Sequence, residues 1–334
     1  MYLLYARSGF RRAVRMYLGD PGMWVFPNPL RWSWIGITSL ACFDCRHRTL
    51  ATLSTIAGIL AVALTWWIAR ELFGSAVALV AAALAATSPL QLALGRRALG
   101  DEFVCAMVLA SIAALLFYLR DPRPTRLVLW IVATTLAIAA KELFLFSYPL
   151  VLGFWWLRAR KLRRLEVAAW LAPPLLFFAL FCALAGDVTS FFAVARATAS
   201  TATAATYPTQ YQSGPPQRML IDLMAVAPIV TCVAIAALIA LRRHPLAALA
   251  FAMLAVHALL PSQNVRYIAA VEPLLRILAA AFLVTELRDR RWLAGGLIVN
   301  AAVELLLFYA IFIRAAVYDP VTDNLLRALK MLPR

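Results

Sequence analysis

Long apolar runs recur through most of the chain and limit its possible folds more than any other feature. Each run is close to the roughly 20 residues that an α-helix needs to cross a bilayer. Only 14% of the 334 residues are charged, whereas soluble domains carry about a quarter. The sequence therefore predicts an all-α polytopic membrane protein. The clearest runs are residues 49–67, 75–94, 103–119, 167–185, 223–241 and 292–313.

Basic segments between these runs predict which helix ends face the cytoplasm. Loops rich in Arg and Lys stay on the cytoplasmic side of membrane proteins. If every basic segment of this chain lies on the cytoplasmic side, residues 127–157 must cross the membrane twice, with an external turn at Lys141–Glu142. The same reasoning gives about ten transmembrane helices from Thr49 onward. The basic segments are residues 120–126, 158–164, 242–243 and 288–291, together with Arg70.

This topology divides the chain into three predicted parts. Residues 1–48 form an external interfacial segment, residues 49–313 the transmembrane domain, and residues 314–334 an external tail. Within the transmembrane domain, residues 187–221 form a long external loop. The alternative for the N-terminal part is a cytoplasmic segment that anionic lipids hold at the membrane.

The N-terminal part is predicted to contain an amphipathic helix. Arg7, Arg11 and Arg15 recur every four residues and so share one helical face. Phe10 and Val14, with Leu18, form an apolar face, as in helices that lie along a membrane surface. We expect the arginine face to meet a phosphate.

Four charged residues in the stretch GRRALGDEF stand out, because no other charge occurs between Leu72 and Leu119. The topology places them at external helix ends. A lone arginine there is usually an anchor, and a carboxylate at a helix N-terminus is often a cap. Anchoring a helix end and capping a helix do not require two acids beside two arginines, so we interpret the four residues as a candidate functional cluster. Its members are Arg96, Arg97, Asp101 and Glu102.

Other charged and polar residues within apolar segments are expected to have structural roles. Glu272 and Arg276 are four residues apart and are predicted to pair. Asn300 and Glu304 have the same spacing and are predicted to bond neighbouring helices.

The net charge of +16 is explained by the cytoplasmic loops, so we expect no nucleic-acid partner. No P-loop and no Gly-x-Gly-x-x-Gly stretch occurs, and a cytosolic nucleotide site therefore has no support. The five cysteines are too few and too scattered for a disulfide framework.

Three stretches, taken in order, resemble a known family. They are SPLQLALGRRALGDEF, AKELFLFSYPLVL and NVRYIAAVEPLL. Together they look like the bacterial relatives of protein O-mannosyltransferases and of the lipid A aminoarabinose transferases. Those proteins are polytopic glycosyltransferases of the GT-C fold. The resemblance extends from about residue 50 to residue 285.

The resemblance implies transfer of a sugar from a polyprenyl-phosphate donor to an acceptor hydroxyl, with inversion, at the extracytoplasmic face of a bacterial inner membrane. The acceptor could be a lipid, a glycan or a protein. An external site has no access to cytosolic nucleotide sugars, so a lipid-linked donor is consistent with the predicted topology.

Such chemistry needs a carboxylate that takes the acceptor proton, and positive charge on the departing phosphate from Arg, Lys or a divalent metal. Asp101 and Glu102 are the candidate catalytic acids, and Asp101 could also support a metal. The candidate phosphate-binding residues are Arg96, Arg97, Lys141, Arg266, Tyr267, Arg7 and Arg11.

The sequence departs from the family pattern at its start. The family carries its principal acid pair in the first external loop, after a first transmembrane helix. The stretch MYLLYARSGF resembles the segment directly after that pair, and neither the pair nor the helix precedes it here. We hypothesise that Met1 is an internal methionine and expect the chain as written to be nearly inactive. A stop codon directly before Met1 would contradict this.

The alternative to a transferase is a non-enzymatic multi-pass protein: a transporter, a flippase or an inactive structural partner. Transporters often contain internal repeats and charges near the bilayer midplane. The sequence shows no repeat, and its charges gather at the predicted outer helix ends, which favours the transferase.

Overall fold

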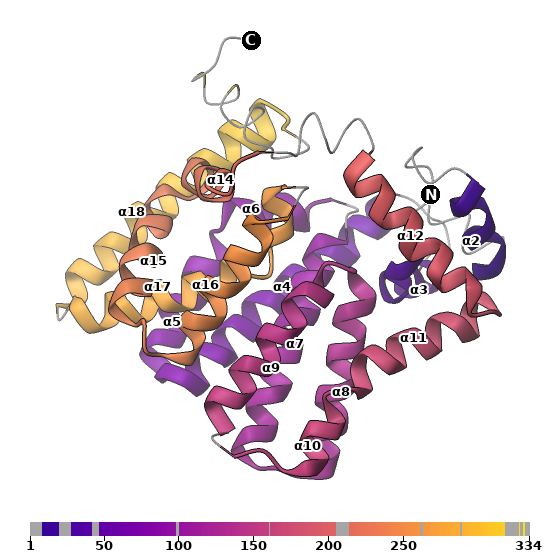
Figure 1. Ribbon diagram of the computed structural model, residues 1–334. Coiled ribbons are helices and arrows are strands. Elements are labelled where there is room, and N and C mark those ends of the chain that lie inside the picture. The colour runs from indigo at the N-terminus through magenta and orange to yellow at the C-terminus, as the bar shows by residue number, and fades with distance from the viewer. Residues whose placement is uncertain are drawn as a thin grey trace.

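The computed structural model places the chain in a helical bundle, which confirms the predicted all-α fold class (Figure 1). A helix satisfies its own backbone polar groups, as the interior of a bilayer requires. No β-strand occurs in the described residues. The structure describes residues 9–19, 28–41, 47–97, 100–159, 161–204, 214–260, 263–287, 289–317, 327 and 330.

Short connections join most of the helices, so that neighbours in sequence are mostly neighbours in space. The elements are α2 (Phe10–Gly19), η1 (Pro29–Arg31), α3 (Trp32–Leu40), α4 (His47–Phe73), α5 (Ser75–Ala86), α6 (Pro89–Gly95), α7 (Asp101–Arg120), α8 (Pro124–Ala140), α9 (Phe144–Ala159), α10 (Arg164–Ala169), α11 (Ala172–Ala185), α12 (Thr189–Ala204), α14 (Arg218–Val226), α15 (Pro228–Ala240), α16 (Pro245–Ala258), η2 (Val265–Ile268), α17 (Glu272–Glu286), α18 (Arg290–Leu307) and η3 (Phe308–Arg314).

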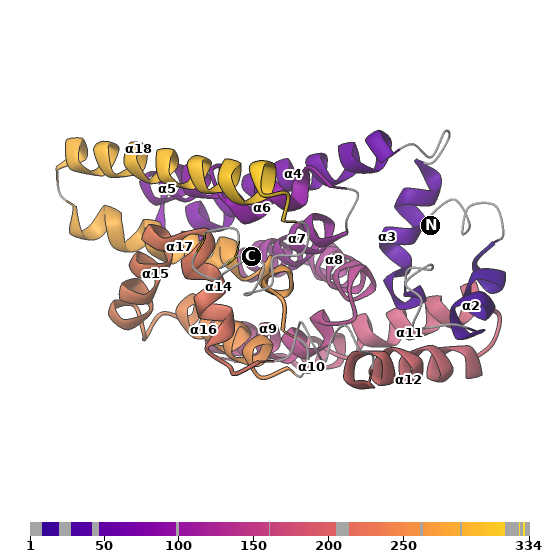
Figure 2. The same ribbon diagram turned by 90° about the horizontal axis from the view of Figure 1, so that it is seen from above.

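Helix α7 forms the centre of the bundle. It packs most extensively against α4 and α8, and Figure 2 shows it between α4 on one side and α9 on the other. Leu109, Ile112 and Leu115 on α7 are fully buried. Outer helices instead expose large apolar side chains, such as Leu175 on α11 and Ile298 on α18. That distribution suits a bundle surrounded by lipid, where apolar surface carries no penalty.

Four helices within the described residues are long and apolar enough to cross a membrane: Thr49–Phe73, Asp101–Arg120, Arg164–Ala185 and Arg290–Arg314. Shorter apolar helices, including α8, α9, α15 and α16, lie among them. The predicted helix break at Lys141–Glu142 is confirmed, because α8 ends at Ala140 and α9 begins at Phe144, and the two crossings with an external turn stay a prediction. The multi-pass architecture is therefore as expected, and the number of ten crossings stays a prediction.

The second predicted crossing is bent by 59° between α5 and α6. Pro89 is the cause, since its ring leaves no backbone N–H to continue the helix from α5. Ser88 then caps the new helix by accepting a hydrogen bond from the backbone N–H of Gln91 at 3.2 Å. The bend places the end of α6 directly before α7.

The predicted N-terminal amphipathic helix is α2. Its buried residues are Ala13, Val14 and Tyr17, while Arg11 and Arg15 are exposed. It packs against α11 and α12, and α12 occupies residues 189–204 of the predicted external loop (Figure 1). Most of the predicted external tail, residues 314–334, lies outside the described residues.

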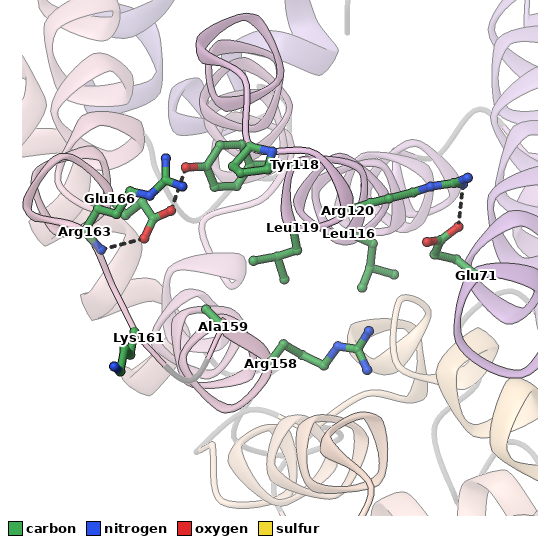
Figure 3. A pocket seen from close by; sticks show the side chains of 11 residues that line it. Glu71, Leu116, Tyr118, Leu119, Arg120, Arg158, Ala159, Lys161, Arg163 and Glu166 are labelled. Atoms are coloured by element: carbon green, nitrogen blue, oxygen red, sulfur yellow. Dashed lines mark hydrogen bonds and ion pairs between the residues drawn. The ribbon is translucent and has the colours of Figure 1, made fainter.

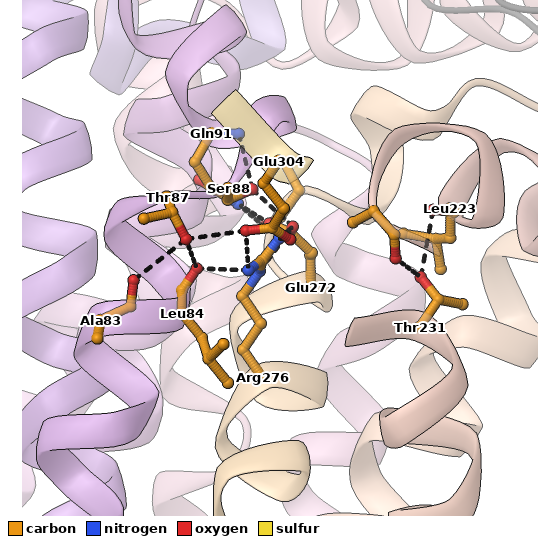
Figure 4. A network of polar contacts seen from close by, with 12 residues as sticks. Ala83, Leu84, Thr87, Ser88, Gln91, Leu223, Thr231, Glu272, Arg276 and Glu304 are labelled. Atoms are coloured by element: carbon orange, nitrogen blue, oxygen red, sulfur yellow. Dashed lines mark hydrogen bonds and ion pairs between the residues drawn. The ribbon is translucent and has the colours of Figure 1, made fainter. Parts of the chain in front are cut away.

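A buried polar network joins α5, α6, α17 and α18 (Figure 4). Arg276 donates to Glu272 at 2.8 Å, which confirms the predicted pair, and to both oxygens of Glu304 at 2.8 and 3.1 Å. Glu304 also accepts from Thr87, so the predicted bond between helices is confirmed for this residue. The prediction for Asn300 is wrong, because its side chain has no hydrogen-bond partner in the described residues.

Candidate active site

A charged cluster lies where α7 begins. The Nζ atom of Lys141 donates to Oδ1 of Asp101 at 2.6 Å, and an Nη atom of Arg266 lies 3.9 Å from Oδ2. Asp101 and Lys141 are only 8% and 6% exposed. Three segments far apart in sequence thus meet around one carboxylate.

Local sequence sets the direction of each side chain. Lys141 leaves α8 in an extended conformation, with φ −159° and ψ 126°, and it packs back toward the start of α7. On the opposite side, Asn264 caps η2 by accepting from the backbone N–H of Arg266 at 3.0 Å. The Lys141 ammonium also lies 4.6 Å from the ring centroid of Tyr267, a cation–π distance.

A second ion pair adjoins the first. Arg31, at the end of η1, donates to both oxygens of Glu142 at 2.6 and 2.9 Å. Arg–carboxylate pairs with two hydrogen bonds hold both groups in a fixed geometry. Burial lowers the pKa of the Arg31 guanidinium, but Glu142 and then Asp101 raise it above its usual range. Arg31 is therefore part of the same electrostatic cluster.

Arg31 is the member of the cluster that sequence reasoning missed. An Asn-Pro pair favours the start of a turn, and Asn28 indeed caps η1 by accepting from the backbone N–H of Leu30 at 3.0 Å. That signal predicts the short helix that ends at Arg31. Nothing in the sequence predicts its partner, which lies 111 residues away.

The pair between Arg31 and Glu142 predicts a pH dependence of stability. Burial raises the pKa of the Glu142 carboxyl, but Arg31 lowers it more strongly, to about 2. The stabilisation is therefore complete above the unfolded pKa of about 4.3 and is lost as the pH falls toward 2. We expect Glu142→Gln to lose about 1.5–3 kcal/mol near pH 7, as for a hydrogen bond to a charged group.

The measurement is thermal unfolding in detergent between pH 3 and pH 7. The stability difference between wild type and Glu142→Gln should shrink as the pH falls below about 4.3. Glu286→Gln changes an exposed glutamate and should behave like wild type throughout. A Glu142→Gln difference that stays constant with pH would contradict the pairing.

Glu102 lies apart from this cluster. Successive residues on a helix point about 100° apart, so Glu102 faces α4 while Asp101 faces Lys141. The Glu102 carboxylate lies beside Gly58 of α4, and a Cβ atom added to that glycine would be 3.5 Å from Oε2 of Glu102. Within the described residues, neither of its carboxylate oxygens has a hydrogen-bond partner. Its predicted catalytic role stays a prediction.

Arg96 and Arg97 point toward the C-terminal part of the chain. Arg96 donates to the backbone carbonyl of Phe312 at 3.3 Å, and Arg97 to that of Val317 at 2.8 Å. These hydrogen bonds link both arginines to the segment that follows α18. Their predicted contact with a phosphate stays a prediction.

Arg11 is separate from the cluster. Arg11 lies beside Gly186, at the end of α11. Arg7 lies outside the described residues, and a phosphate contact stays a prediction for both.

The predicted divalent metal stays a prediction. No group of three or more His, Cys, Asp or Glu side chains in this part of the chain could hold one. Asp101, the predicted metal-supporting acid, is instead bound to Lys141.

Among the described residues, the cluster contains three cations and two carboxylates. A phosphate beside these cations would interact with them strongly, because the dielectric constant is low where water is largely excluded. Arg and Lys together suit a phosphate, which accepts hydrogen bonds at several oxygens. The members are Arg31, Lys141, Arg266, Asp101 and Glu142.

Comparison with solved structures identifies the architecture. A crystal structure of ArnT from Cupriavidus metallidurans bound to undecaprenyl phosphate matches with a TM-score of 0.59 and 19% sequence identity. The match covers 88% of this chain and 58% of that one. The chain has the ArnT fold. The apo state of the same ArnT matches with a TM-score of 0.54 and 19% identity, over 91% of this chain and 60% of that one.

The resemblance inferred from the sequence is thus confirmed at the level of the ArnT fold. Residues 28–186 also match the family described as dolichyl-phosphate-mannose-protein mannosyltransferase. That region includes Arg31, Asp101, Lys141 and Glu142. A comparison with curated proteins finds no match. The chain spans about three fifths of the length of the ArnT chains that it matches.

Proposed function

We propose that the protein is an inverting glycosyltransferase that moves a sugar from a polyprenyl-phosphate donor to an acceptor hydroxyl. The observation that carries this proposal is the cation-rich cluster around Asp101 and Lys141. The match to an ArnT structure bound to undecaprenyl phosphate supports a polyprenyl-phosphate ligand. The match to the mannosyltransferase family supports sugar transfer.

In the proposed reaction, the acceptor oxygen attacks the anomeric carbon as the bond between that carbon and the phosphate oxygen breaks. The bond's electron pair leaves with the polyprenyl phosphate, and the acceptor hydroxyl gives its proton to water. Lys141, Arg266 and Arg31 would stabilise the charge on the departing phosphate. Asp101 would hold Lys141 and Arg266 in place, because a carboxylate engaged by two cations is a weak base.

We also propose that this site faces away from the cytoplasm. Helix α7 has 20 residues, which at about 1.5 Å per residue gives about 30 Å, the thickness of the hydrocarbon core. Its two ends therefore lie at opposite faces of the membrane. Basic segments 120–126 and 158–164 lie beyond the Arg120 end, which favours the cytoplasm for that end. The Asp101 end would then face outward in a bacterial inner membrane.

The test is sugar transfer from a labelled polyprenyl-phosphate sugar by the protein in lipid vesicles. Lipid, glycan and peptide acceptors would be supplied in separate reactions. Because the chain as written is expected to be nearly inactive, we expect wild type to move label to one acceptor class slowly, but measurably above vesicles without protein. Absence of turnover with every lipid-linked sugar tried, or translocation of the lipid without bond cleavage, would contradict the proposal and favour a non-enzymatic membrane protein.

A further inference from the structure

A second cluster of cations lines a cavity at the other end of α7 (Figure 3). The cavity has a volume of about 340 Å³. At about 30 Å³ for each water molecule of the liquid, it could hold roughly ten waters, which is room for a small polar headgroup. Its charged lining residues are Glu71, Arg120, Arg158, Lys161, Arg163 and Glu166.

Both acidic residues of this cavity are already engaged. Glu71 pairs with Arg120 at 3.3 Å. Glu166 accepts from the Tyr118 hydroxyl at 2.7 Å and from the backbone N–H of Arg163 at 2.7 Å. Figure 3 shows these two carboxylates at opposite sides of the cavity, each directed to its own partner. With four cations and two carboxylates, the lining keeps a net positive charge.

Three cations of the cavity are available. Arg158, Lys161 and Arg163 are exposed, and none forms an ion pair with a carboxylate of the described residues. Figure 3 shows the Arg158 guanidinium on the cavity side of α9, facing the end of α7. The charge left unbalanced here calls for an anionic ligand.

The residues next to these cations are apolar and exposed. Leu157 directly precedes Arg158 on α9 and is 49% exposed. Leu165 follows Arg163 by two residues and is 64% exposed. Charge and apolar surface thus adjoin one another at the end of the membrane-crossing helices. An amphipathic ligand, with an anionic head and hydrocarbon chains, fits both surfaces.

We propose that this cavity binds the headgroup of an anionic phospholipid. Its phosphate would lie among Arg158, Lys161 and Arg163, with the acyl chains along Leu157 and Leu165. Basic pockets between helices on the cytoplasmic side of membrane proteins recognise such headgroups. This lipid site lies at the opposite end of α7 from the proposed transfer site, so the two proposals can fail separately.

The test is binding of phosphatidylglycerol to the full-length, delipidated protein in a neutral detergent, measured by native mass spectrometry. Phosphatidylcholine is the zwitterionic comparison, and inorganic phosphate is added as a competitor. We expect phosphatidylglycerol to bind at least about tenfold more tightly than phosphatidylcholine, because its headgroup has a net negative charge, whereas the choline cation of phosphatidylcholine is repelled by the three cations. Inorganic phosphate at the same concentration should not displace it.

The variant Arg158→Gln/Lys161→Gln/Arg163→Gln should lose that preference. Arg242→Gln/Arg243→Gln/Arg290→Gln removes the same charge from exposed positions outside the cavity and should keep it. Arg158→Lys/Arg163→Lys preserves the charge and should also keep it. Equal binding of both lipids by wild type, or an unchanged preference in the first variant, would overturn the proposal. Displacement by equimolar phosphate would indicate a site for soluble phosphate and would overturn it as well.

Discussion

Asp101→Asn should lower the rate of sugar transfer while it strengthens binding of undecaprenyl phosphate. In the structure, Asp101 accepts a hydrogen bond from Lys141 at 2.6 Å and lies 3.9 Å from Arg266. A donor phosphate must compete with that carboxylate for the same cations. Asparagine has nearly the same shape but no charge, so Lys141 would be more available to the ligand. Phosphate affinity should rise by roughly tenfold, since a hydrogen bond to a charged group is worth about 1.5–3 kcal/mol.

The transfer rate should fall by about 100-fold, because the cations that orient the departing phosphate lose their common anchor. Turnover at saturating donor and binding in the absence of acceptor measure the two effects separately. Asp289→Asn is the matched control, since Asp289 is an exposed helix cap and asparagine also caps helices. A simple loss of both binding and turnover in Asp101→Asn would contradict the positioning role.

Arg276→Met should destabilise the protein strongly, and by more than Glu142→Gln. Arg276 is fully buried and joins Glu272 on α17 to Glu304 on α18 (Figure 4). Methionine has a similar volume, but it leaves two carboxylates buried without their cation. Removing one partner of a buried ion pair typically costs about 3–5 kcal/mol. Thermal unfolding in detergent measures the change, with Arg290→Met as an exposed control.

A triple variant distinguishes loss of charge balance from loss of packing. Arg276→Met/Glu272→Gln/Glu304→Gln has no charge left in the network and should recover most of the lost stability. If the single variant is as stable as wild type, the network does not hold α17 and α18 together. If the triple variant is no more stable than the single one, packing of the arginine side chain is the main contribution.

The sequence predicted those features that depend on local patterns. Apolar runs predicted the helices, and the requirement that basic loops share one side predicted the break at Lys141. The i,i+4 spacing of Glu272 and Arg276 predicted their ion pair. Each of these inferences uses residues that are close in sequence, for which helix geometry fixes the relative position.

Contacts between distant segments were predicted less well. Arg96 and Arg97 were grouped with Asp101 because they are neighbours in sequence, but their hydrogen-bond acceptors are on residues 312 and 317. Residues 98–99 lie outside the described part of the chain, between these arginines and α7. Arg31 was missed because it is distant from Glu142 in sequence, and the packing of η1 against α8 brings the two together. Helix periodicity carries no information on such packing.

Binding of undecaprenyl phosphate to wild type and to Lys141→Met tests the proposed donor site most directly. It requires no acceptor and no turnover. Lys141→Met should weaken binding by at least about tenfold, as expected for one lost hydrogen bond to a charged group. Arg242→Met removes an exposed cation outside the cluster and should bind like wild type. Equal affinities for Lys141→Met and wild type would show that the polyprenyl phosphate binds elsewhere.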